Sequence, residues 1–220
     1  MHPTPRPAWW APWRVAWWVV LLAVVAVVLF GVAFAVRLSC GLGDCAAPAV
    51  RRLLSLDAVG GLPRLFTTGV LAAAGVLAGV RGWCARGRLR HWWAGVAGTA
   101  LVLAVLKLES AHSAVESGTS PVTTLVLGVA IAVPALALLT GAGRAWGVAE
   151  AIRVVSAFAA YALAAVGLDA VTALVAALQD DAGTVSRSSA AFVEELGEAL
   201  AAVVALAVVR AATEVSRTGR

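Results

Sequence analysis

Six long runs of apolar residues constrain this chain more than any other feature of its sequence. They cover residues 15–36, 65–83, 92–109, 122–139, 154–178 and 190–209. Because a helix needs about 20 mostly apolar residues to cross the hydrocarbon of a bilayer, these lengths predict transmembrane helices. The second and third runs reach that length only when they extend to Trp83 and to about Glu109, so five spans are the alternative count. We predict an all-α, polytopic membrane helix bundle that forms one domain over residues 1–220.

The composition agrees with a membrane protein and leaves little room for a soluble domain. The chain is 61% hydrophobic and 13% charged, whereas a soluble domain is nearer half apolar and a quarter charged. The net charge of +5 does not indicate nucleic-acid binding, because the basic residues lie in short segments between the apolar runs. We therefore expect the lipid bilayer, and no nucleic acid, as a partner.

Tryptophan and arginine indicate which ends of the helices share a side of the membrane. All nine tryptophans lie where the predicted helices meet one face, the level that this side chain favours. They are Trp9, Trp10, Trp13, Trp17, Trp18, Trp83, Trp92, Trp93 and Trp146. The segments on that side carry eleven of the basic residues and the opposite segments six. By the positive-inside rule both termini are then cytoplasmic. A composition rich in Ala, Val, Gly and Arg is typical of a high-GC bacterial gene, so we expect an integral protein of a bacterial plasma membrane.

The first run and the loop after it allow further predictions. At 22 residues the run is longer than the 7–15 residues of a signal-peptide core, which favours a retained helix over a cleaved signal. The following outer loop holds Cys40 and Cys45, which we expect to form a disulfide outside the cell; two free thiols in a flexible turn are the alternative. Residues 50–59 are mildly amphipathic and are expected to lie along the outer surface.

Small residues and proline predict local features of the helices. Gly75 and Gly79 form a GxxxG pattern, which lets two helices approach closely in lipid. Packing within the subunit is the first interpretation of this pattern, and a homo-oligomer through Gly75 and Gly79 is the alternative. Ser120 and Pro121 are typical of a helix start, and Pro134 should bend the helix that follows.

Acidic residues of three predicted helices come to one depth, in the outer third of the membrane. With a rise of about 1.5 Å per residue, the angular positions put each group on one stripe of its helix. The candidate cation or proton cluster consists of Glu109, His112, Glu116, Asp169, Glu194, Glu195 and Glu198. Glu198 is the deepest acid of its helix and should face the bundle, within about 10 Å of Asp169 or Glu109, since a charge facing lipid is costly. Lys107 lies nearly opposite Glu109, so we expect it to extend outward.

Carboxylates in a low-dielectric space need protons, a cation or arginines. The first hypothesis is therefore cation or proton binding and transport. An alternative is a metal-dependent enzyme acting on lipid at the outer leaflet, because Glu109 and His112 have the i,i+3 spacing of two ligands of a divalent metal. A further alternative is a non-catalytic membrane subunit whose acids pair with Arg37, Arg64 or Arg187. Nucleotide-binding loops, a nucleophile elbow and a zinc-protease motif are absent from the sequence.

Overall fold

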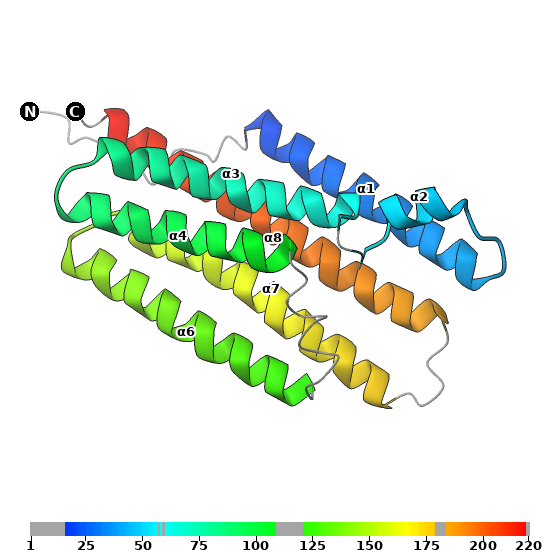
Figure 1. The fold of residues 1–220 in the computed structure, drawn as a ribbon. Helices are drawn as coiled ribbons and strands as arrows, with labels where there is room; N and C mark the ends of the chain where they lie inside the picture. The colour runs from blue at the N-terminus through cyan, green and yellow to red at the C-terminus, as the bar shows by residue number, and fades with distance from the viewer. Residues whose placement is uncertain (1–15, 57, 59, 109–120, 179–183, 219–220) are drawn as a thin grey trace, which may run out of the picture.

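The computed structural model describes residues 16–56, 58, 60–108, 121–178 and 184–218, which form seven helices and no strand (Figure 1). The helices are α1 (Trp17–Gly41), α2 (Pro48–Leu53), α3 (Leu62–Cys84), α4 (Arg88–Leu108), α6 (Pro121–Ala145), α7 (Ala151–Leu178) and α8 (Thr184–Thr218). The predicted all-α membrane bundle is confirmed. Most helices extend a few residues beyond the apolar runs, because a helix does not need to end where the hydrocarbon ends.

Five of the described helices are long and apolar enough to cross a membrane, namely α1, α3, α4, the part of α6 from Gly128 and the part of α7 up to Leu168. The sixth predicted span, residues 190–209, is the central part of α8. Its passage across the bilayer, and with it the count of six, stays a prediction.

Five helices form a ring around the core, in the order α3, α4, α6, α7, α8, and back to α3. Helix α1 lies outside this ring against α8 and α3. Figure 1 shows that α3, α6 and α8 end on the side of the bundle where α4 and α7 begin. Trp83 in the last turn of α3, Trp92 in the first turns of α4 and Trp146 just after α6 therefore belong to one end of the bundle, as the sequence predicts.

Two of the tryptophans at this end of the bundle, Trp92 and Trp93, pack inside the protein. Trp92 and Trp93 are each only 1% exposed and belong to the main hydrophobic core. The Trp92 Nε1–H donates to the carbonyl oxygen of Leu139 at 3.1 Å, so its polar group is satisfied by the protein rather than by water. Trp17 and Trp83 are exposed, as expected of interfacial residues. Trp9, Trp10 and Trp13 lie outside the described residues.

The GxxxG pattern of α3 is used for packing inside the chain. A Cβ atom on Gly75 would come within 2.8 Å of the Leu101 side chain and 3.3 Å of the Ala97 carbonyl oxygen, both on α4. A Cβ atom on Gly79 would contact only the Ala97 Cβ, at 3.8 Å. This surface of α3 is therefore covered by α4, and a homo-oligomer through the two glycines stays untested.

The segment between α1 and α3 differs in detail from its prediction. Helix α1 continues to Gly41, and Cys40 and Cys45 are joined by a disulfide. The short surface helix is α2, which begins before the predicted range 50–59 and ends within it. The residues after α2 turn inward, and Leu56 is buried against α1 and α8. Helix α6 begins at Pro121 and contains Pro134, whereas Ser120 lies outside the described residues.

Candidate functional site

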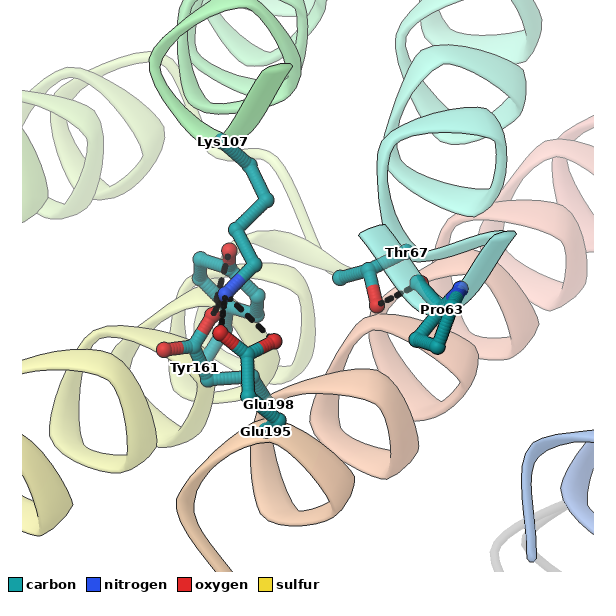
Figure 2. A network of polar contacts seen from close by, with 6 residues as sticks. All are labelled: Pro63, Thr67, Lys107, Tyr161, Glu195 and Glu198. Atoms are coloured by element: carbon teal, nitrogen blue, oxygen red, sulfur yellow. Dashed lines mark hydrogen bonds and ion pairs between the residues drawn. The ribbon is translucent and has the colours of Figure 1, made fainter. Parts of the chain in front are cut away.

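A buried ion cluster lies inside the ring and joins three helices (Figure 2). The Lys107 Nζ atom of α4 donates a hydrogen bond to Glu195 Oε1 at 2.9 Å and lies 2.8 Å from Oε2 of the same carboxylate. It also lies 2.8 Å from Glu198 Oε2. The Tyr161 hydroxyl of α7 donates to that same Glu198 oxygen at 3.4 Å. One ammonium group is therefore shared by two carboxylates of α8.

Each of these charged side chains lies on a buried helix face that is otherwise lined by small residues. On α4, Lys107 continues the buried series Ala97, Ala100 and Ala104, which turns one face toward the core at helical spacing. On α8, Glu195 and Glu198 precede Ala202 and Ala205 on the buried face. Alanine leaves room between the helices, and the long side chains at the end of each stripe fill that room. Lys107, Glu195 and Glu198 are accordingly 8%, 6% and 3% exposed.

The prediction that Lys107 extends outward is wrong. It was based on the angle to Glu109, on the assumption that Glu109 marks the inner face of its helix. The buried face of α4 is instead the one that carries Ala100 and Ala104, and Lys107 shares it. The informative signal was the spacing of a lysine from small residues, three and seven positions before it.

The cluster bridges two helices that are not direct neighbours along their length. Helix α4 packs against α3 and α6, while α8 packs against α7, α3 and α1. Only long side chains can span the interior between α4 and α8. The contacts of Lys107 with the two glutamates therefore link the two helices that flank α3 in the ring.

Arg64, in the first turn of α3, is a second buried cation near the cluster. It is 6% exposed and interacts electrostatically with Glu195. Its Nε and Nη1 atoms are buried and form no hydrogen bond with any described residue. Lys107 and the two glutamates alone carry one excess negative charge when all are ionised. Arg64 adds a positive charge near the cluster and forms no hydrogen bond with it.

The nearby threonine of α3 uses its hydroxyl group for another hydrogen bond. Thr67 of α3 appears beside the cluster in Figure 2, but its hydroxyl donates to the Pro63 carbonyl oxygen of its own helix at 3.3 Å. Such a bond back to the preceding turn is common for threonine in helices. Thr67 therefore belongs to the wall of the site and not to the ion cluster.

The structure describes only part of the predicted acidic cluster. Glu195 and Glu198 lie inside the bundle, so the expected inward direction of Glu198 is confirmed. Glu194 is partly buried beside them and has interactions of its own. Asp169 lies on α7, but its side chain is outside the described part, and so are Glu109, His112 and Glu116 altogether. The predicted contact of Glu198 with Asp169 or Glu109 therefore stays a prediction.

The described residues do not form a separate metal-binding site. Among the described residues, no group of three or more His, Cys, Asp or Glu side chains is arranged to hold a metal ion. The two buried glutamates are already in contact with an ammonium group. A metal centre formed with Glu109 and His112 stays a prediction that involves residues outside the described ranges.

Tyr161 is the site residue that sequence reasoning missed. It is the only tyrosine of the chain and lies within an apolar run. Val154 and Phe158, seven and three positions before it, share its buried face on α7. A buried tyrosine usually finds a partner for its hydroxyl. A lone tyrosine on the apolar stripe of a membrane helix was therefore a usable signal.

Comparison with protein-family models, with curated protein sequences and with solved structures finds no match for this chain.

Proposed function

We propose that this chain binds and transports protons, or another small cation, across the plasma membrane of a bacterium, and that the site is the Lys107–Glu195–Glu198 cluster. One observation carries the proposal: a single buried ammonium group holds two carboxylates and connects α4 to α8 across the ring. Ionisable groups at membrane depth are costly and therefore serve as markers of ion pathways and proton relays.

The arrangement couples protonation to the contact between helices. A proton on Glu198 removes one of the two negative charges that attract Lys107, and the direct link of α4 to α8 then depends on Glu195 alone. Tyr161 still donates to Glu198 or accepts from it, because a hydroxyl group can do both. Loading and release of a proton would thus weaken and restore the bridge between α4 and α8.

Lys107 also argues for a proton over a metal ion as the cargo. Its ammonium lies between the carboxylate oxygens, where a bound cation would have to lie. A metal ion would have to displace the lysine, whereas a proton needs only one carboxylate oxygen.

The test is proton flux into liposomes that contain the purified protein and a trapped pH-sensitive dye. An imposed pH gradient, with the membrane potential clamped by valinomycin and potassium, should dissipate faster than in empty liposomes. Glu198→Gln, which keeps shape and hydrogen bonding but removes the charge, should abolish the extra flux. Glu214→Gln is the matched control, because Glu214 lies on the same helix in an exposed pair with Arg210. Equal flux in Glu198→Gln and wild-type protein would contradict the proposal.

A second candidate is a non-catalytic membrane subunit whose charges only hold the helices together. The observation that favours it is that Glu195 and Glu198 are already in contact with Lys107 and that the buried cation Arg64 interacts with Glu195. Under this alternative, wild-type liposomes leak protons no faster than empty ones, and Glu198→Gln changes stability alone.

A further inference from the structure

The Cys40–Cys45 disulfide lies at the end of α1, far in sequence from the ion cluster, and closes a very short loop. Five positions separate the two cysteines, and Gly41 and Gly43 lie between them, Gly43 with a φ of 105°. A disulfide that closes so short a loop removes less conformational entropy from the unfolded chain than one that closes a long loop. The bond joins α1 only to the residues that follow it and does not cross-link the helices of the ring. A purely structural role is therefore small.

A guanidinium group lies against both sulfur atoms. The Arg51 Nη1 atom of α2 is 3.6 Å from Cys40 Sγ and 4.0 Å from Cys45 Sγ. Helix α2 begins at Pro48, and its short turn directs Arg51 back over the disulfide while the adjacent Arg52 makes no contact with either sulfur in the described part of the chain. A neutral disulfide gains little from a nearby cation, but a thiolate gains a counter-charge.

We propose that the Cys40–Cys45 disulfide is a redox-active centre that exchanges with an external dithiol, and that Arg51 holds the Cys40 thiolate when the pair is reduced. The substrate class is a pair of neighbouring thiols, on another protein or a small molecule, on the membrane face that carries the end of α1. This inference is independent of the proposed proton transport.

The two sulfur atoms have different roles in the exchange. Cys45 is exposed, whereas Cys40 is partly buried and lies closer to Arg51. A substrate thiolate therefore attacks Cys45 Sγ, the S–S bond breaks, and its electron pair leaves on Cys40 Sγ as a thiolate beside Arg51. The second substrate thiol, as a thiolate, then attacks the substrate sulfur of the mixed disulfide and releases Cys45 as a thiolate. The substrate is oxidised by two electrons to a disulfide and the cysteine pair is reduced. One substrate proton passes through water to Cys45, and the other is released to water, so that Cys40 stays a thiolate beside Arg51.

The size of the effect follows from the exposure of the site. A unit charge about 4 Å from a thiolate contributes about 1 kcal/mol in water, which corresponds to a roughly fivefold change in an equilibrium constant. Only a part of this difference appears in the rate of attack, because the rate depends on leaving-group stability with a coefficient below one. Salt should reduce the effect, since exposed charges are screened.

The experiment uses the full-length protein in detergent at pH 8 with dithiothreitol as the dithiol. Reduction is followed by quenching with a maleimide of known mass and counting modified cysteines, with Cys84 as the internal reference because it is free and exposed. We expect the folded protein to be reduced at millimolar dithiothreitol, and Arg51→Gln to be reduced about two- to threefold more slowly than wild type. Arg51→Lys should restore most of the rate, and Arg52→Gln, the matched control, should behave as wild type.

Two results would overturn the proposal. One is a disulfide that millimolar dithiothreitol reduces only under denaturing conditions. The other is an equal rate in wild-type protein, Arg51→Gln and Arg52→Gln. Should Arg51→Gln fail to fold, the wild-type protein alone still tests the proposal. Its reduction rate, divided by that of a small model disulfide, should fall when sodium chloride is raised to 1 M. An unchanged ratio of the two rates would contradict a role for Arg51.

Discussion

Removal of the Lys107 ammonium tests the structural basis of the ion cluster most directly. In Lys107→Met the side chain keeps similar length and loses the charge, so Glu195 and Glu198 lose contacts of 2.8 to 2.9 Å with their shared partner. The side chains of the two glutamates are 8% and 4% exposed, so water cannot replace the lysine. Breaking a buried pair in this way costs about 3–5 kcal/mol. For a chain of this size that corresponds to a decrease in Tm of roughly 6 to 20 °C.

The assay is thermal unfolding in detergent at pH 7.5, followed by tryptophan fluorescence. The loss should shrink at acidic pH, because protons can then neutralise the carboxylates that the lysine no longer holds. Glu214→Gln serves as the control, since its exposed pair with Arg210 is expected to contribute less than about 1 kcal/mol. A Tm of Lys107→Met equal to that of wild type would refute the reasoning, because the ammonium group would then contribute nothing to stability.

A companion variant separates the role of the charges in stability from their role in function. Lys107→Met, Glu195→Leu and Glu198→Leu together replace the buried ions by apolar groups, which is often neutral or stabilising by a few kcal/mol. The triple variant should therefore recover much of the Tm lost in Lys107→Met while remaining inactive in the proton-flux assay. A triple variant that transports protons as well as wild type would contradict the proposed function.

Three further predictions concern packing and topology. Gly75→Ala should lower the Tm by an amount that corresponds to about 1–3 kcal/mol, because the new methyl group meets Leu101. Gly79→Ala has room for a methyl group and should be neutral or slightly stabilising. Equal effects of the two substitutions would contradict the described α3–α4 contact. Trp92→Phe should cost about 1–3 kcal/mol, because the Leu139 carbonyl loses the indole donor and the buried ring becomes smaller. The Tm is compared with that of exposed Trp17→Phe, and equal values would argue against that hydrogen bond. A membrane-impermeant maleimide should label Val185→Cys from outside intact cells and native Cys84 only after the membrane is opened; labelling of both from the same side would refute the predicted topology.

The sequence alone was sufficient for the fold class and for the positions of the long helices along the chain. Runs such as residues 65–83 must be helical in lipid, because the hydrocarbon offers no hydrogen-bond partner to an open backbone. The charge pattern gave an inward direction for Glu198 for a related reason, since lipid does not solvate a carboxylate. The GxxxG pattern likewise indicated a close approach of helices. Each of these conclusions depends on the residue and its medium, not on a particular neighbour.

Only the tertiary structure decided which side chains meet. Lys107 lies 88 positions before Glu195 in the chain, and their contact depends on the order of helices around the ring. No property of either residue alone specifies that order. The same holds for Trp92 and Trp93, whose positions at a helix end indicate an interface, but whose burial follows from the helices packed around them. Local chemistry thus determined which segments form long apolar helices, whereas the rotation of each helix about its axis was fixed by packing with all its neighbours at once.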